Sequence, residues 1–297
     1  MTLRTQILNS ENATQNQTGC LYVVATPIGN LGDVTNRALD TLKKVDWVAA
    51  EDTRHTKQLL TALGIQQNLI SLHEHNEQQR AEQLLQRLKQ GEQGALVSDA
   101  GTPLINDPGY HLVKLLREHE IAVVPVPGVS AVITALSCAG LPTDRFTYEG
   151  FLPAKNSKRL QSLQKLCLES RTMVFYESPH RLLESLSSMK EVFGDDREVV
   201  IGRELTKKFE QFVSGSFVEV LGYFTENLDR VRGEFVVMVA GKIESEEQSE
   251  GAALDVDKMI KVMLEQNLPV KQISEMISQI TGEKKKSIYQ RTLEMKS

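Results

Sequence analysis

The feature that most constrains the fold of this chain is a regular alternation of two kinds of segment, which begins at Cys20. Short apolar runs rich in β-branched residues are separated by longer stretches of helical periodicity. The expected strands are residues 20–28, 46–52, 68–72, 94–100 and 121–128, and the expected helices are residues 35–45, 54–63, 77–90, 109–120 and 129–140. Chains that alternate in this way build a mainly parallel sheet with helices on both faces, so the sequence predicts an α/β fold.

The alternation changes near residues 149–153, and we expect a boundary there between two α/β domains, residues 20–149 and 150–241. In the second domain the expected helices are residues 157–170 and 180–193, and the expected strands include residues 171–178 and 198–205. Residues 210–221, with a central Ser-Gly, and residues 234–241 alternate as strands do, which predicts antiparallel pairing.

The two ends of the chain differ from this pattern. Residues 1–19 are rich in Asn, Gln and Thr and lack the continuous apolar segment of a signal peptide. This composition predicts a disordered tail. The sequence predicts an acidic linker over residues 242–254 and a small helical domain over residues 255–297.

Composition limits the classes of protein to consider. No run reaches the roughly 18 apolar residues of a membrane span, so we expect no membrane partner. The three cysteines lie far apart in apolar surroundings, as reduced thiols of a cytoplasmic protein do. The net charge of −5 repels phosphate, so a nucleic-acid partner would need a local basic face.

Acidic residues recur where the expected strands end, at Asp52, Asp99, Glu177 and Glu204, and arginine lies near three of them. Ordinary turn and cap chemistry explains any one of these loops. Ligands of open α/β sheets bind beyond the carboxyl ends of the strands, so the recurrence predicts a binding site there.

Several kinds of site are disfavoured. The chain has no phosphate-binding P-loop or dinucleotide fingerprint. Residues 128–132 lack the second glycine of a nucleophile elbow. We therefore predict that Ser130 is the N-cap of the following helix. His73 and His75 have no further ligands at recognisable spacing, so we expect no metal. A cofactor that carries a positive charge and an adenosine, such as S-adenosylmethionine, would suit a crevice of carboxylates and small residues.

Nine motifs in order along the chain resemble those of the RsmI family of ribosomal small-subunit RNA methyltransferases, within the tetrapyrrole-methylase-like class. They are TPIGNLGD, AAEDTR, HEHNE, LVSDAGTPLINDPG, VPGVSAVITAL, GFLPAK, FYESPHRL, GRELTKKFE and GEFVVMVAG, and the tail resembles the helix-turn-helix-like piece of that family. Single motifs are weak evidence, but nine in order are highly specific.

The resemblance implies two α/β domains of the class III methyltransferase type, a small C-terminal helical domain and a homodimer. The implied activity is 2′-O-methylation of a cytidine in the decoding region of 16S rRNA, with S-adenosylmethionine in the cleft between the domains. The family motifs place the cofactor loops at Pro27, Gly29, Asn30, Ser98, Asp99, Ala100, Gly101, Pro103, Gly128, Val129, Ser130 and Ala131.

A ribose hydroxyl is a weak acid, so a general base assists its attack on a methyl group. Glu177 is the preferred base, and Asp52, Glu204 and His75 are the other candidates. An ion pair between Glu177 and Arg181, four residues further on, is an equally good explanation of this acid.

RNA binding needs cations, and residues 150–168 contain four of them and no acid: Lys155, Lys158, Arg159 and Lys165. Arg54, Arg181, Arg203, Lys207 and Lys208 add positive charge beside the expected crevice. We predict that these residues contact phosphates. For Lys284, Lys285 and Lys286 in the tail, a solvated helix face is the better reading.

Two other functions fit parts of the sequence. An enzyme of the same fold could methylate a corrin or porphyrin carbon, but it would need neither the basic segment nor the tail domain. A non-catalytic RNA-binding module could keep the fold, but it would not need complete cofactor loops.

Overall fold

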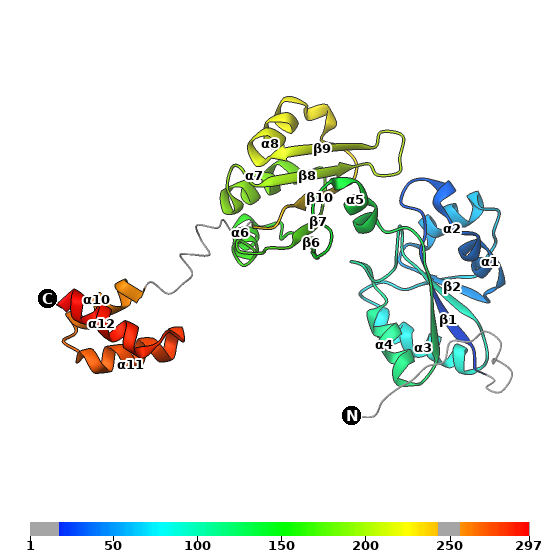
Figure 1. Ribbon diagram of the computed structural model, residues 1–297. Helices are drawn as coiled ribbons and strands as arrows, with labels where there is room; N and C mark the ends of the chain where they lie inside the picture. The colour runs from blue at the N-terminus through cyan, green and yellow to red at the C-terminus, as the bar shows by residue number, and fades with distance from the viewer. Residues whose placement is uncertain (1–17, 243–255, 297) are drawn as a thin grey trace. The chain divides into compact units, whose positions relative to one another are not determined.

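The computed structural model describes residues 18–242 and 256–296, and the chain divides into two compact units, residues 1–241 and 242–297 (Figure 1). The predicted N-terminal tail and the predicted linker fall almost wholly outside the described residues. Among the residues described, no helix combines the length and apolar character that crossing a membrane requires.

The first sheet of unit 1 is entirely parallel, as predicted. Its strands are β1 (Cys20–Val24), β2 (Trp47–Ala50), β3 (Leu69–Ser71), β4 (Gly94–Val97) and β5 (Ala122–Val126), in the order β3-β2-β4-β1-β5. Helices α1 (Asn36–Lys44) and α2 (Thr53–Ala62) pack on one face, and α3 (Glu77–Lys89) and α4 (Tyr110–Glu118) pack on the other. The two buried faces explain why these strands read as continuous apolar runs.

The second sheet is mixed. Its strands are β6 (Phe146–Phe151), β7 (Thr172–Glu177), β8 (Glu198–Arg203), β9 (Gln211–Ser216) and β10 (Phe235–Val239), in the order β6-β7-β10-β8-β9. Only β6 and β7 run parallel, whereas every other pair of neighbours is antiparallel. Helices α6 (Asn156–Gln164), α7 (Leu182–Phe193) and α8 (Phe217–Glu226) share one hydrophobic core with this sheet.

Helix α5 (Ala131–Ala139) covers the opposite face of the second sheet, although it follows directly from β5 of the first (Figure 1). Its buried Val132, Ala135 and Leu136 share a cluster with Val174 and Val236. The chain therefore changes sheets between β5 and α5, and β6 runs across the predicted boundary at residue 150. Helix α5 is apolar enough to pack against this second core, but its sequence does not show which of the two sheets it covers.

The expected strand over residues 210–221 is half wrong. Strand β9 ends at Ser216, and the rest of the segment is the start of α8. The Ser216 side chain accepts a hydrogen bond from Glu219 N while the Glu219 carboxylate accepts one from Ser216 N. This capping box starts the helix in spite of the alternating pattern. The predicted antiparallel pairing is confirmed, but β9 and β10 each pair with β8 and not with one another.

Unit 2 contains three helices within its described part: α10 (Val256–Glu265), α11 (Val270–Thr281) and α12 (Lys285–Lys296). They enclose a small core of Val256, Ile260, Ile273, Ile277 and Ile288. The small C-terminal helical domain is thus confirmed.

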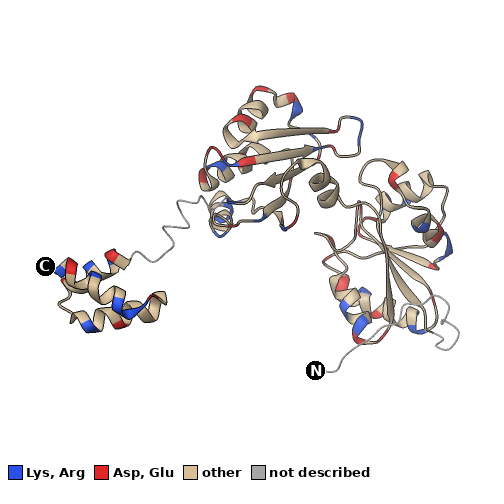
Figure 2. Ribbon diagram, viewed as in Figure 1, with Lys and Arg blue, Asp and Glu red and all other residues tan. Residues whose placement is uncertain are grey.

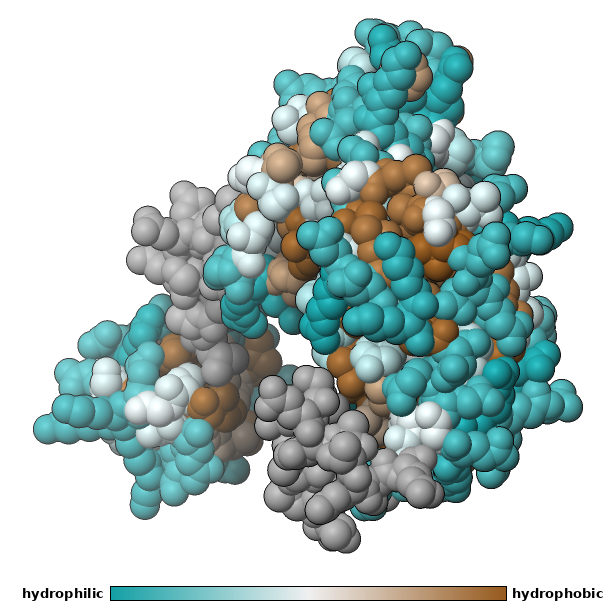
Figure 3. All heavy atoms as spheres, turned by 90° about the vertical axis from the view of Figure 1, so that its right-hand side faces the viewer, coloured by the Kyte–Doolittle hydropathy of each residue, from teal (hydrophilic) through white to brown (hydrophobic). Residues whose placement is uncertain are grey.

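Charged residues lie mostly on the helices and loops of unit 1, and its strands contain few of them (Figure 2). Hydrophobic residues are exposed as well, among them Ile133 of α5 and Phe209 in the loop between β8 and β9. On the face shown in Figure 3, hydrophobic residues gather in one area that hydrophilic residues border.

Candidate active site

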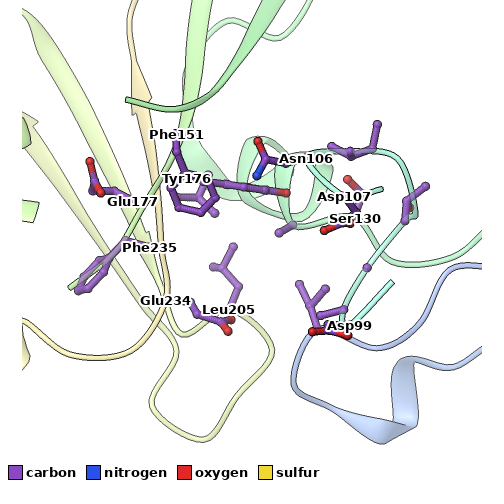
Figure 4. Close-up of a pocket in the computed structure, with 17 residues that line it drawn as sticks. Asp99, Asn106, Asp107, Ser130, Phe151, Tyr176, Glu177, Leu205, Glu234 and Phe235 are labelled. Carbon is purple, nitrogen blue, oxygen red and sulfur yellow. The ribbon is translucent and has the colours of Figure 1, made fainter. Parts of the chain in front are cut away.

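A cavity of about 270 Å³ opens in unit 1 where loops of both sheets meet (Figure 4). From the first sheet it is lined by Ile28 after β1, residues 99–102 and 105–107 after β4, and Ser130 and Ala131 after β5. Three parallel strands thus end at the cavity, as the strand-end rule predicts.

The second sheet supplies the facing wall. Phe151 ends β6, Tyr176 and Glu177 end β7, Leu205 follows β8, and residues 234–236 include the start of β10. The last group enters the wall because β10 runs antiparallel to β7 and β8, which places Phe235 opposite both Glu177 and Arg203.

The loop after β4 owes its irregular composition to its contacts with two other loops. Gly101 exchanges two backbone hydrogen bonds with Thr26, of 2.9 and 3.0 Å, in a bridge between the loops after β4 and β1. Thr102 Oγ1 donates to Val129 O at 2.9 Å, which ties in the loop after β5. Gly101 has a φ of +80°, and Leu104 and Asn106 also adopt left-handed backbone, with φ of 73° and 74°.

Glu77 fixes the far end of this loop. Its buried carboxylate accepts hydrogen bonds from Gly109 N at 3.0 Å and His111 N at 2.7 Å, at the first turn of α4. A carboxylate is stabilised there by the unpaired amides and the helix dipole. Both ends of the loop are therefore anchored.

The predicted cofactor residues divide into two groups. Asp99, Ala100, Gly101, Ser130 and Ala131 line the cavity. The others lie next to it in the same loops: Pro27, Gly29, Asn30, Ser98, Pro103, Gly128 and Val129. Ser130 stands at the N-cap position of α5, but its side chain makes no capping hydrogen bond among the described residues, which corrects that part of the prediction.

Glu177 lines the cavity and is also fully engaged in hydrogen bonds. Its Oε1 accepts from Ser178 N at 2.8 Å and pairs with Arg181 Nη2 at 3.0 Å, and its Oε2 accepts from Ser185 Oγ. In Figure 4 the carboxylate points away from Ser130 and Asp107. The ion pair that the sequence offered as the alternative explanation of Glu177 is confirmed.

The other three predicted bases, Asp52, Glu204 and His75, lie outside the cavity lining. Asp52 is the N-cap of α2 and binds the Arg54 guanidinium in two places, and hydrogen bonds from Arg54 lower its pKa to about 2. Burial alone would raise the pKa of Glu204, but hydrogen bonds from Lys207 Nζ and Glu234 N lower it overall. A carboxylate with a lowered pKa is a weak proton acceptor.

Lys207 connects the two sheets instead of facing solvent. Its methylene chain packs where a side chain at Gly29 would lie, and its ammonium bridges Glu204 Oε1 at 2.8 Å and Glu234 Oε2 at 3.0 Å. Two carboxylates already neutralise this cation, so the predicted contact with RNA phosphate would require Lys207 to give up its contacts between loops.

Two more predicted RNA contacts are corrected by burial. Arg159 is 3% exposed and donates to Ser188 Oγ, Ala154 O and Asn156 Oδ1. Arg203 is 4% exposed and donates to the carbonyls of Arg232 and Phe209. Their guanidinium groups stabilise the second domain and leave no surface for phosphate.

The remaining predicted cations differ in how free they are. Lys155, Lys158, Lys165 and Lys208 are exposed. Arg54 is exposed but paired with Asp52, and Arg181 is half-buried between Glu177 and Leu152 O. Among the residues described, no three His, Cys, Asp or Glu side chains form a group that could hold a metal ion, and the expectation of no metal stays a prediction.

Asp107 is a cavity residue that the sequence prediction missed. Burial raises its pKa to about 6, the nearby charges of Glu51 and Asp99 add to this rise, and a hydrogen bond from Ser98 opposes it. It stands in the stretch with the strongest family motif. However, its place in the cavity depends on the left-handed backbone at Leu104 and Asn106, which nothing in the local sequence announces.

Residues 20–220 match the family model of Tetrapyrrole (Corrin/Porphyrin) Methylases, and residues 250–296 match that of the RsmI C-terminal HTH domain. Among solved structures, the chain resembles uroporphyrin-III-C-methyltransferase from Thermus thermophilus, with a TM-score of 0.53 and 20% identity over 75% of this chain and 94% of the other. It also resembles the methyltransferase CobJ, with a TM-score of 0.57 and 17% identity over 76% and 98% of the two chains. Similarity at this level establishes the fold alone.

Curated relatives are much closer in sequence. Ribosomal RNA small subunit methyltransferase I of Escherichia coli O157:H7 is 50% identical over 97% of this chain and 99% of its own length. The proteins of the same name from Pasteurella multocida and Vibrio cholerae are 46% and 48% identical, over 94% and 92% of this chain and 98% and 94% of theirs. The chain therefore belongs to the ribosomal RNA small subunit methyltransferase I family.

Proposed function

We propose that this protein transfers a methyl group from S-adenosylmethionine to the 2′-oxygen of a cytidine ribose in the decoding region of 16S rRNA. The observation that carries the proposal is the identity of 50% over almost the full length of a curated small-subunit rRNA methyltransferase, tail domain included. The choice of cytidine, of the 2′-oxygen and of the decoding region rests on the motif resemblance alone.

The cavity fits a cationic methyl donor. Asp99, Asp107, Glu177 and Glu234 line it, and no Lys or Arg is among the lining residues that the structure describes. Its volume of about 270 Å³ lies near the lower end for sites that bind small molecules. When bound, S-adenosylmethionine supplies an electrophilic methyl group on a positively charged sulfur, which nearby carboxylates stabilise.

The residues of the chain contribute mainly by positioning. The hydrogen bonds that join Thr26 to Gly101 and Thr102 to Val129 fix three loops at one edge of the sheet. Alignment of an acceptor oxygen with a methyl carbon and its leaving group supplies a large part of the rate in such a displacement. Phe151, Tyr176 and Leu205 make the facing wall apolar, and a partly dry cavity favours a step in which charge is dispersed.

The substrate would be held outside the cavity by exposed cations. We assign this role to Lys155, Lys158 and Lys165, which lie along or beside α6, and to Lys208, with Arg54 as a further candidate that would have to leave Asp52. Contacts of this kind fix the register of an RNA without reading its sequence.

Among the predicted bases, Glu177 alone lines the cavity, but Arg181 already holds its carboxylate. It would have to exchange its bond with Arg181 for one with the acceptor hydroxyl. Asp52 and Glu204 enter the proposal only as supports of the loops that carry them.

A homodimer also belongs to the proposal. Exposed Ile133 and the hydrophobic area in Figure 3 offer surface that a second copy would cover. A substrate in the small ribosomal subunit would place the enzyme in the cytoplasm.

Methylation of a tetrapyrrole carbon is the second candidate, because the matching family model carries that description. One experiment separates the candidates. The protein is incubated with radiolabelled S-adenosylmethionine and either assembled small subunits, naked rRNA or a tetrapyrrole precursor. We expect label in the rRNA of assembled subunits, at an alkali-resistant 2′-O-methyl cytidine. Label in the tetrapyrrole, or in none of the three, would contradict the proposal.

A further inference from the structure

The carboxylates around the cavity differ in whether a cation neutralises them. Glu177 pairs with Arg181, and Glu234 pairs with Lys207. Asp99 and Asp107 also line the cavity, and within residues 18–242 and 256–296 no Lys, Arg or His forms an ion pair with either of them. Asp99 Oδ1 accepts a hydrogen bond from Asp52 N at 3.1 Å, which ties Asp99 to the start of α2, so Asp107 is the freer of the two. A proton acceptor needs a free pair of electrons on oxygen, and an ion pair with a cation occupies or weakens it.

The position of Asp107 is set by the anchored loop that carries it. Glu77 holds this loop at Gly109, two residues further on. Asn106 Oδ1 lies close to Gly150 of the second sheet, where a Cβ added to the glycine would meet it at 3.1 Å. Gly150 has a φ of +67° and stands at the register shift between β6 and β7, so the bulge makes room for this contact. Such anchoring holds a catalytic carboxylate in one geometry.

Five groups influence the ionisation of Asp107 or are influenced by it. Ser98, whose hydroxyl also lies 3.2 Å from Ala100 O, lowers the pKa of Asp107, and the negative charges of Glu51 and Asp99 raise it. The Asp107 charge in turn acts on the phenols of Tyr148 and Tyr176. Burial and the Asp107 charge in turn raise the pKa of both tyrosines, which therefore stay protonated. Figure 4 shows the Tyr176 hydroxyl directed toward the side of the cavity that carries Asp107 and Ser130.

We propose that Asp107 is the general base, which accepts the proton of the acceptor hydroxyl as methyl transfer proceeds. The inference rests on the proposed function. In the balanced step the ribose oxygen forms its bond to the methyl carbon while the methyl–sulfur bond breaks. The bonding pair stays on sulfur, which becomes neutral, and the hydroxyl proton moves to a carboxylate oxygen of Asp107 and then to water.

The raised pKa of Asp107, about 6, supports this role. At neutral pH the carboxylate is mostly ionised, and it is a stronger base than Asp52, whose pKa is about 2. General-base assistance typically contributes about 10²- to 10⁴-fold to a rate.

The first test compares Asp107→Asn with Glu177→Gln on assembled small subunits. We expect D107N to lower kcat by about 10²-fold or more, with Kd for S-adenosylmethionine, measured by calorimetry, changed by less than about threefold. E177Q should keep an acid limb in its pH profile. Wild-type kcat in D107N would overturn the inference while leaving the proposed function intact. Failure of the wild-type protein to label RNA would remove both.

Glu51→Gln provides a second test, which uses the pH dependence of kcat. That dependence should change only if Asp107 takes part in the reaction and is not merely structural. Glu51 is outside the cavity lining, and its negative charge raises the pKa of Asp107. We expect the acid limb of the kcat profile, near pH 6 in the wild-type protein, to move toward the ordinary carboxyl value of about 4. An acid limb unchanged by E51Q would contradict the assignment, whether or not D107N folds.

Thermal unfolding of the unliganded protein tests the same carboxylate without activity. Because the folded-state pKa of Asp107 is raised, its contribution to stability is present below about pH 4 and is lost as pH rises through about 6. The Tm of D107N should therefore increase relative to the Tm of the wild-type protein as pH rises from 4 to 7. A Tm difference that does not change with pH would contradict the buried, titrating carboxylate on which the inference depends.

Discussion

The two sheets of unit 1 deliver residues to the cavity in different ways. In the parallel sheet β1, β4 and β5 all end at the same edge, so each contributes the residues that follow it. In the mixed sheet β10 runs against β7 and β8, so the same edge receives the ends of two strands and the beginning of a third. In the parallel sheet every lining residue follows the end of a strand, whereas in the mixed sheet residues such as Glu234 precede a strand, and a search after strand ends misses them.

The difference extends to stability. The loops of the first sheet are held by backbone hydrogen bonds and left-handed residues, as at Gly101. The wall from the second sheet is held by ion pairs, Glu177 with Arg181 and Lys207 with Glu204 and Glu234. Substitutions in the two regions should therefore differ in how they affect binding and unfolding.

The largest effect is expected from Gly101→Ala. A Cβ at this position would lie 3.3 Å from Ile28 Cγ2 in a backbone of φ +80°, inside the network that joins three loops. We expect kcat for methyl transfer to assembled small subunits to fall by about 100-fold or more, because a misplacement of about 1 Å costs that much in the rate of a positioned reaction. Gly64→Ala is the matched control, with φ +68° and open space around it. Equal losses in the two variants would show that backbone strain, and not loop geometry, is responsible.

Glu177→Gln should act mainly on the stability of the second sheet. The Glu177 side chain is 2% exposed, and its removal leaves Arg181 without its charge partner. Loss of a partner from a buried pair costs about 3–5 kcal/mol, and the half-exposed Arg181 reduces this to about 2 kcal/mol. The midpoint of denaturant unfolding should fall at pH 7. An unchanged midpoint would show that this ion pair does not hold the cavity wall.

The cations of the basic segment should separate into two groups. Replacement of Lys155, Lys158 and Lys165 by alanine should lower affinity for small subunits by about tenfold and flatten its dependence on salt, because fewer counterions are released. Arg159→Met should lower Tm and leave the salt dependence unchanged, since Arg159 is buried beneath Ser188. A salt dependence equal to wild type in the triple variant would exclude α6 from the RNA interface.

The smallest effect is expected at Asp52. Its pKa is lowered to about 2 by Arg54, so its contribution to stability exists above the ordinary value of about 4 and is lost as pH falls through 2. Asp52→Ala should lower Tm slightly at pH 7 and not at pH 2. Asp52→Asn, which can still cap α2, should fall between the wild-type protein and D52A. A difference in Tm between D52A and the wild-type protein that does not change with pH would show that the charge of Asp52 does not provide the stabilisation.

Much of the fold was predictable because local patterns carry it. The five strands of the first sheet are apolar runs bounded by turn residues, and the inner strands β2 and β4 are buried on both faces, so each strand is visible in the sequence. The errors fall where local and tertiary preferences conflict: an alternating run becomes α8 because Ser216 and Glu219 cap it, and α5 leaves the first sheet to cover the second.

The candidate site was predictable only in part. The motif loops containing Asp99, Gly101 and Ser130 do line the cavity, and so does Glu177. Arginines close to these motifs in sequence, Arg159 and Arg203, instead point into the protein. Side-chain burial depends on packing from distant segments, which a sequence motif does not contain.

The sequence by itself determined the alternation of strands and helices, the parallel first sheet and the family to which the chain belongs, because hydrophobic periodicity and motif order are local properties. Only the tertiary structure decided which carboxylates have a cation and which do not. Glu177 and Arg181 are four residues apart, but Glu234 meets Lys207 across 27 residues, and Asp107 faces Tyr176 from the other sheet. Charge neutralisation depends on distances in space, and these are set when the two sheets pack.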